Sequence, residues 1–291
     1  MSAHDPRQEY VRALARHTNR DRSVIAFDCG SGLFAGPWAG RPGSLVRAES
    51  PALMLALAAG AASARRRALC HGPCGPLAAA AAAALGSVIG APPAVALVGV
   101  APCEPPEPPC DLAPLGALSA IRVLCPADGP QAAAAADTLV GIDGLVYMRL
   151  PAGLLPDVTR PGETFEPDAL LPLREGRDLC IFAAGAAAAP ALRAADQLLG
   201  QGLFASVVLA PALRPLDGEE IVRWARRSGR ALTAEEHGPG GLGDAVCRAL
   251  RGQPVAVDTV YLPAGPPAVA EGARRTAADE IFLRALALLA W

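Results

Sequence analysis

The chain has 291 residues, enough for two ordinary domains, and carries a formal net charge of −2 with a sequence pI near 6.1. That balance excludes the basic footprint of a nucleic-acid-binding protein, and the absence of any lysine excludes Schiff-base chemistry and a P-loop. The 8 cysteines are scattered through apolar runs and no secretory leader is recognisable, so we expect free thiols in the cytoplasm.

The first half of the chain alternates β-rich and helical runs. Strands that alternate with helices favour βαβ units and a largely parallel sheet. Residues 76–101 are apolar but interrupted by glycine and proline, so we expect a buried helix and strand there and no membrane span. We predict helices over residues 9–18, 50–67, 77–85 and 130–140, and strands over residues 24–28, 68–70, 94–100, 121–125 and 145–150.

The second half repeats this alternation after a proline-rich and charged stretch without a clean period. We therefore predict an α/β protein with two domains, residues 1–155 and residues 175–291, joined by a linker over residues 156–174. We predict strands over residues 179–184, 205–209 and 230–234, and helices over residues 191–199, 218–227, 243–250 and 276–290.

Ordered motifs along both halves resemble the C-terminal half of transketolases. In the second half these are residues 176–185 (GRDLCIFAAG), 214–217 (RPLD), and 232–243 with their AEEH and GGLG segments. In the first half they are residues 47–50 (RAES), 123–128 (VLCPAD) and 144–149 (GLVYMR). Several motifs in the family order are a specific signal, whereas one glycine-rich turn would be a weak one.

The resemblance implies a pyrimidine-binding domain of a thiamine-diphosphate enzyme at residues 1–155 and a transketolase C-terminal-like domain at residues 175–291. In this family a separate domain with a GDG motif holds the cofactor's diphosphate through Mg²⁺, and no GDG occurs in this sequence. We therefore expect a partner subunit, equivalent to the N-terminal half of a transketolase, to supply that domain and the Mg²⁺. The expected assembly is an α2β2 heterotetramer that transfers a two-carbon ketol or acyl unit, in a role outside the central pentose pathway.

The resemblance also assigns residues to the cofactor. Glu49 matches the family glutamate that hydrogen-bonds the aminopyrimidine ring and promotes formation of the ylid, so we expect a desolvated carboxyl with a raised pKa. The alternative is a solvated glutamate at a helix start. Asp28 matches a strand end near the cofactor cleft.

Three further residues are candidates for a role in the site or at the domain interface. Arg149 matches an arginine that faces the substrate, and its alternative is an interdomain salt bridge. His71 stands where transketolases place aromatic residues, and it could act as a flat surface, as an acid/base group, or not at all in a degenerate site. For His237, in the AEEH segment, we expect a structural role near the domain interface.

Other chemistries are weakly supported by the sequence. A zinc site would need two loops to meet, with a spacing unlike that of zinc fingers, and its candidate ligands are Cys70, His71, Cys74, Cys103 and Cys110. A Cys103–Cys110 disulfide would be unusual in a cytosol, and no Gly-x-Ser-x-Gly motif is present. Two rival functions stay open: a non-catalytic scaffold subunit, and the β component of a 2-oxoacid dehydrogenase that docks an acyl-carrier protein. The sequence does not identify the donor, the acceptor, or whether the product leaves free or on a carrier.

Overall fold

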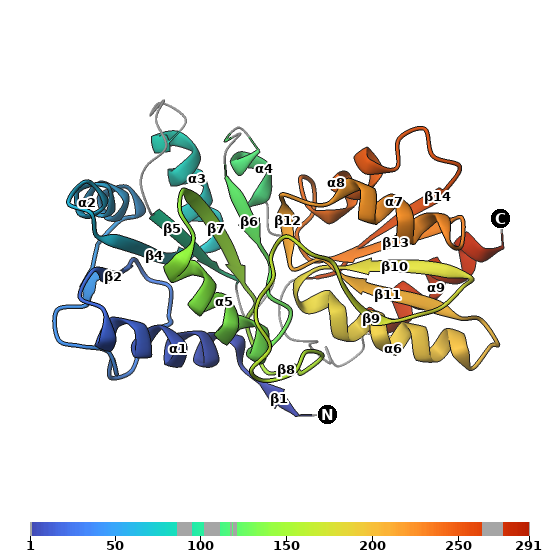
Figure 1. The fold of residues 1–291 in the computed structure, drawn as a ribbon, viewed down its shortest axis with the longest axis horizontal. Coiled ribbons are helices and arrows are strands. Elements are labelled where there is room, and N and C mark those ends of the chain that lie inside the picture. The colour runs from blue at the N-terminus through green and yellow to red at the C-terminus, as the bar shows by residue number, and fades with distance from the viewer. Residues whose placement is uncertain are drawn as a thin grey trace.

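The computed structural model describes residues 2–85, 95–101, 111–116, 118, 121–263 and 276–290. Within these ranges the chain forms two α/β units side by side, each built on its own sheet (Figure 1). The predicted α/β fold class with parallel sheets is confirmed. The proline-rich run at residues 102–110, including Cys103 and Cys110, lies outside the described residues.

The first unit carries the elements expected from its alternating pattern, together with four short elements that were not predicted. Its elements are β1 (Ala3–His4), α1 (Pro6–Arg20), β2 (Val24–Asp28), β3 (Leu45–Arg47), α2 (Pro51–Ser63), β4 (Arg67–Pro73), α3 (Cys74–Leu85), β5 (Val95–Val100), α4 (Leu112–Leu115), β6 (Arg122–Leu124), α5 (Gly129–Gly141), β7 (Leu145–Leu150) and β8 (Leu155–Pro156). The four elements that were not predicted are β1, β3, α4 and β8.

The second unit begins inside the segment that the sequence predicts to be a linker. Its elements are β9 (Leu171–Arg174), β10 (Leu179–Ala183), a 3-10 turn (Gly185–Ala187), α6 (Ala188–Leu199), β11 (Ala205–Leu209), β12 (Ala212–Arg214), α7 (Gly218–Arg226), β13 (Arg230–Glu235), α8 (Leu242–Ala249), β14 (Ala256–Tyr261) and α9 (Ala277–Leu289).

The sheet of the first unit has the strand order β12-β6-β7-β5-β4-β2-β3, and only β12 runs antiparallel to its neighbour. The sheet of the second unit has the order β14-β13-β10-β11-β9, with β9 antiparallel. Strand β12 follows β11 in the chain yet pairs with β6, so the second unit contributes a strand to the first sheet. The two units are thus joined by backbone pairing as well as by the linker.

The helix starts follow local chemistry that the sequence shows. Asp5, Ser50, Asp128 and Asp217 each accept a hydrogen bond from a backbone amide in the first turn of the helix that follows. Thr276 and Asp279, in the first turn of α9, form a reciprocal capping box. These caps explain why the predicted helix positions hold to within a few residues.

Two neighbouring predicted elements are wrong in extent. The expected helix over residues 50–67 ends at Ser63, and Arg65 takes a left-handed backbone conformation with φ of 58° that turns the chain into β4. Strand β4 then runs to Pro73, three residues beyond the strand predicted at 68–70. Alanine-rich composition favours helix everywhere, and the parallel pairing of β4 with β2 and β5 overrides it.

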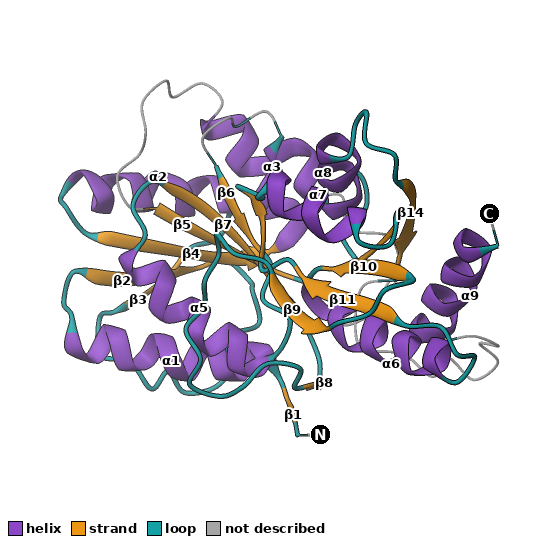
Figure 2. Cartoon of the chain, turned by 45° about the vertical axis from the view of Figure 1, so that its right-hand side comes forward, coloured by secondary structure: helices purple, strands orange, loops and turns teal. Residues whose placement is uncertain are grey.

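Helices cover both faces of each sheet (Figures 1 and 2). Helices α1 and α5 pack on one face of the first sheet around Tyr10, Leu14 and Leu139, while α6 and α9 cover one face of the second. A third apolar cluster is continuous across both units, from Met54 and Leu77 in the first to Trp224 in the second. The core therefore does not stop at the boundary between the units.

Candidate functional site

The carboxyl ends of the parallel strands bring several predicted residues into one row. Asp28 on β2 pairs in register with Arg47 on β3 and with His71 on β4. Ligands of open parallel sheets bind outside this edge, because loops and helix starts gather there. The row, bounded by the first turn of α2, is therefore the candidate site in the first unit.

Asp28 is buried at the end of β2, with 4% of its surface exposed. Its Oδ1 accepts hydrogen bonds from the backbone amide and from the hydroxyl of Ser31, which fold the loop after the strand back over the carboxylate. The guanidinium of Arg47 lies 3.5 Å from its Oδ2 and also donates to the Phe34 carbonyl at 2.8 Å. Asp28 thus holds the loop after β2 and the Arg47 side chain in place at the carboxyl edge of the sheet.

His71 is fully buried inside β4 and has no exposed surface. Its Nδ1 donates to the Phe27 carbonyl at 2.8 Å, so its Nε2 accepts from the Tyr10 hydroxyl at 2.9 Å. Burial lowers the pKa of His71 to about 4, so the ring is neutral at physiological pH. This placement favours a structural role in the chain, and its predicted stacking or acid/base role stays a prediction.

Glu49 lies between β3 and the first turn of α2, and its side chain is exposed. No hydrogen bond or ion pair joins its carboxylate to the described residues. The desolvated surroundings expected from the resemblance are therefore not provided by this chain alone. A covering surface from another chain would have to provide them.

Arg149 points to the opposite face of the sheet from His71. Strand side chains alternate, and the row of His71 continues through Val98 to Met148, one residue before Arg149. The structure therefore separates these two predicted site residues, although the sequence places both near strand ends. Arg149 is 2% exposed, and its Nη1 lies 3.4 Å from Glu236 Oε2 of the second unit.

The ion pair of Arg149 is the interdomain interaction that the sequence left as an alternative. Its Nε also lies 3.3 Å from Oδ2 of Asp111, the residue before α4. Burial alone would lower the pKa of Arg149, but the carboxylates of Asp111 and Glu236 outweigh burial and raise it. Sequence reasoning missed Asp111, because nothing in the residues around it signals a partner almost forty positions away.

The AEEH and GGLG segments build the boundary between the units. Glu235 accepts from the backbone amides of Leu242 and Gly243, each at 2.7 Å, and so caps α8. A methyl group at Gly241 would overlap the Glu235 carboxylate, which explains the glycine in this motif. In the structure this segment is a packing turn.

His237 connects the same motif to the first unit. It is almost fully buried, its Nδ1 donates to Glu235 at 3.2 Å, and it also contacts the Cys125 side chain at the end of β6. Burial would lower the pKa of His237, but Cys125 and the Glu235 hydrogen bond outweigh it and raise the pKa to about 10. The expected structural role near the domain interface agrees with this placement.

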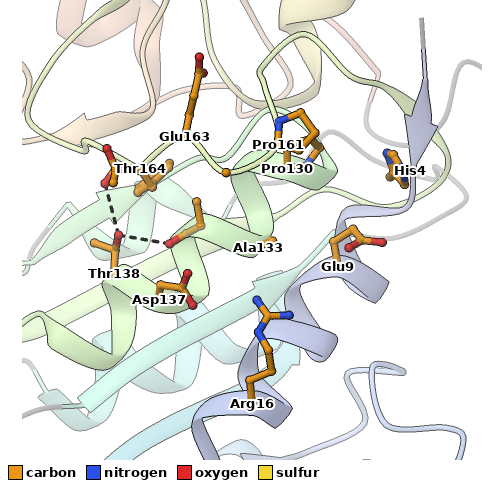
Figure 3. Close-up of a pocket in the computed structure, with 13 residues that line it drawn as sticks. His4, Glu9, Arg16, Pro130, Ala133, Asp137, Thr138, Pro161, Glu163 and Thr164 are labelled. Carbon is orange, nitrogen blue, oxygen red and sulfur yellow. Dashed lines mark hydrogen bonds between the residues drawn. The ribbon is translucent and has the colours of Figure 1, made fainter.

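Two cavities lie along the linker, away from the carboxyl edge of β2 and β3. One of about 340 Å³ is bounded by α1, α5 and residues 161–165, with Glu9, Arg16 and Asp137 around it (Figure 3). The other, of about 500 Å³, lies between the linker, Leu170 and Pro211. Neither cavity is lined by Asp28, Glu49, His71 or Arg149, so the candidate site is an open edge and not one of these cavities.

The described residues show no cluster of three histidine, cysteine or carboxylate side chains that could hold a metal ion. The zinc and disulfide alternatives both involve Cys103 and Cys110, which lie outside the described residues. None of the helices in the described ranges combines the length and apolarity that a membrane span needs.

Comparisons with known proteins agree with the motifs. Residues 169–279 match the family model described as the transketolase C-terminal domain. Over 126 residues the chain is 36% identical to the 6-deoxy-6-sulfo-D-fructose transketolase subunit SqwH of Clostridium sp. (strain MSTE9), covering 43% of this chain and 39% of that protein. It is 32% identical over 155 residues to an apulose-4-phosphate transketolase subunit of Phocaeicola vulgatus, covering 53% of this chain and 50% of that protein.

The solved structures extend the likeness to nearly the whole chain. A chain described as a split gene transketolase, in an inactive beta4 tetramer, superposes with a TM-score of 0.84 at 27% identity and 98% coverage of both chains. The match spans half or less of the length of the curated relatives named above. These findings confirm the resemblance to the C-terminal half of transketolases and to subunits of split transketolases.

Proposed function

We propose that this chain is the C-terminal, β-like subunit of a heteromeric transketolase-type enzyme that depends on thiamine diphosphate. The observation that carries the proposal is Glu49: an exposed carboxylate without a partner among the described residues, at the carboxyl edge of a parallel sheet. The motif resemblance assigns the family glutamate to this position. A carboxylate left unpaired at such an edge fits a site that a second subunit completes.

The residues at this edge fit the pyrimidine end of the cofactor. When bound, thiamine diphosphate supplies a nucleophilic carbon that attacks a carbonyl and carries a two-carbon unit. Glu49 would accept a hydrogen bond from the aminopyrimidine ring and hold the proton that activates it. Asp28 and Ser31 would fix the neighbouring loop, and the partner subunit would hold the diphosphate and its Mg²⁺.

The helices beside Glu49 support an assembly. Helices α2 and α3 contain no charged residue over their whole lengths, yet Leu53 and Leu57 on α2 are 46% and 42% exposed. An uncharged helix face with exposed leucines is typical of a surface that another chain covers. We propose that this face and the edge at β3 are covered in an α2β2 heterotetramer.

The test is calorimetric binding of thiamine diphosphate with Mg²⁺. We expect no binding to the chain alone, binding after co-expression with the protein encoded beside it, and loss of binding in Glu49→Gln of that complex. The matched control is Glu219→Gln, an exposed glutamate in α7 of the second unit. A stable complex that binds no cofactor would overturn the proposal.

That negative outcome would favour a scaffold subunit, the second candidate. The observation in its favour is His71, which is buried and hydrogen-bonded at both ring nitrogens where a stacking side chain is expected. In that case Glu49→Gln would leave every property of the complex unchanged.

A further inference from the structure

The boundary between the units contains a buried ion pair whose components come from three separate parts of the chain. Arg149 on β7 is held between Asp111, at 3.3 Å, and Glu236, at 3.4 Å. Asp111 has no exposed surface and Glu236 is also buried. Two carboxylates thus lie beside one guanidinium that is almost fully buried.

The side chain of Asp111 contacts Arg149 and does not cap the helix that Asp111 precedes. It occupies the N-cap position of α4 but makes no side-chain cap hydrogen bond, although aspartate is among the residues that most often make one. Its Oδ2 instead accepts from the Tyr147 hydroxyl at 2.5 Å. A methyl group at Gly99 would overlap that hydroxyl, so the strand next to β7 leaves room for the tyrosine.

The second unit also contacts α4 directly. Arg214, on the strand that joins the first sheet, donates from Nη1 to the Leu115 carbonyl at 3.4 Å. A methyl group at Gly240 would lie 3.4 Å from the backbone of Ala113, so the glycine turn also packs closely on this helix. Helix α4 is therefore contacted by the second unit at two points, and Asp111 stands at its start.

We infer that Arg149, Asp111 and Glu236 form an ion-pair latch that fixes the orientation of the two units and makes them unfold together. The reason is that a buried charge that loses one partner is strongly destabilising, so the three groups tolerate only one arrangement of the units. Burial of Arg149 between two carboxylates also leaves its charge unavailable to a substrate anion. The latch lies within this chain and does not depend on the proposed function.

The latch is tested by following each unit with its own tryptophan. Trp38 reports on the first unit and Trp224 on the second, in two single-tryptophan proteins that also carry Trp291→Phe. We expect both tryptophans to report the same unfolding midpoint in denaturant. In Glu236→Gln, we expect their unfolding constants to differ by about tenfold or more, which is about 1.4 kcal/mol.

A double-mutant cycle adds a second measurement. The effects of Glu236→Gln and Arg149→Met on the unfolding constant should depart from multiplicative behaviour by about tenfold or more. The matched control is the half-exposed pair of Arg284 and Asp258, 3.3 Å apart within the second unit, replaced by Met and Asn. For that pair we expect coincident midpoints and departures within about twofold.

The two measurements also cover a variant that folds poorly. If Arg149→Met does not fold, the comparison of tryptophans in Glu236→Gln carries the test by itself. Coincident midpoints in Glu236→Gln, together with multiplicative effects in the cycle where it can be measured, would overturn the latch.

Discussion

The carboxyl edge near β3 and the boundary between the two units differ in how far the chain completes them. At the edge, Glu49 is exposed and unpaired among the described residues, and Leu53 and Leu57 face solvent. At the boundary, Arg149 and His237 are buried, and each has charged or polar partners from the other unit. The boundary side chains are thus paired within the chain, whereas the Glu49 carboxylate at the edge has no partner among the described residues.

This difference has a physical basis. A buried charge requires a partner, whereas an exposed carboxylate is stabilised by water until another surface covers it. An internal boundary can therefore be recognised by its ion pairs, and a site shared between chains by groups without partners. The following predictions test whether the two regions differ as described, beginning with the largest expected effect.

Asp128 anchors the linker to the start of α5. It is fully buried and accepts from the backbone amides of Gln131, Val158 and Thr159 and from the Thr159 hydroxyl. We expect Asp128→Ala to lower the free energy of unfolding by about 3 to 5 kcal/mol, because several buried donors lose their acceptor.

The control for this variant is Asp137→Ala on the same helix, whose carboxylate is mostly exposed and pairs with His17. Urea denaturation should show a loss below about 1 kcal/mol for that control. Equal losses in the two variants would contradict the larger stabilisation expected from a buried carboxylate that is hydrogen-bonded to several donors.

The same chemical change should have opposite effects at two glycines. Gly241→Ala overlaps the Glu235 carboxylate that caps α8, and we expect a loss of about 1 to 3 kcal/mol. Gly60→Ala lies in exposed α2 with open space around it, and we expect a gain of up to about 1 kcal/mol. Thermal unfolding of both variants measures this, and a loss at Gly60 would show that the face of α2 is already packed.

The pH dependence of stability should reveal the buried imidazole of His71. Its folded pKa is about 4 and its unfolded pKa about 6.5, so the unfolded state binds more protons in that window. The stability that His71 contributes is therefore complete above pH 6.5 and falls with pH, by about 2 kcal/mol between pH 7 and pH 5, while His237, whose folded pKa is raised, contributes a smaller change of opposite sign.

Replacement of His71 by Gln should remove this contribution to the slope, even though it lowers stability at every pH. Replacement of His4, which is partly exposed, should keep the slope. Denaturant titrations at pH 5, 6 and 7 give the comparison, and an unchanged slope in the His71 variant would contradict the burial of its neutral ring.

The smallest effect on stability belongs to the apolar face of α2. Leu53→Glu with Leu57→Glu should change the free energy of unfolding by no more than about 0.5 kcal/mol, because both side chains are already exposed. If another chain covers this face, the double substitution should weaken the association of this chain with that chain by about tenfold or more, as measured by light scattering. Leu154→Glu, on the exposed end of the first unit, is the control that should leave association unchanged.

Much of the secondary structure could be predicted from local patterns. The strands at Val24–Asp28, Leu145–Leu150 and Ala205–Leu209 have the predicted bounds, because short β-branched runs flanked by turn residues are strong local signals. Strands β12 and β14 were not predicted, since three residues of Ala, Leu and Arg, or a mixed edge strand, carry little periodicity. The domain boundaries at 155 and 175 stay a prediction.

The candidate site was less predictable than the fold. The sequence placed His71 after a strand, and the longer β4 places it inside one, where its ring packs against Tyr10 and Phe34 and donates to the Phe27 carbonyl. Arg149 was predicted at a strand end without knowing which face it would take. A shift of one residue in a strand reverses the face, so motif position alone leaves this undecided.

By itself the sequence determined the alternation of strands and helices, the capping of the helices and the motifs shared with transketolases, since each depends on neighbouring residues. Only the tertiary structure decided that Glu49 stays exposed, that His71 and Arg149 lie on opposite faces, and that Asp111 meets Arg149 across 38 positions of chain. Burial and pairing depend on strand register and on contacts between distant segments. Those contacts are fixed only when the two sheets and the strand β12 that joins them are in place.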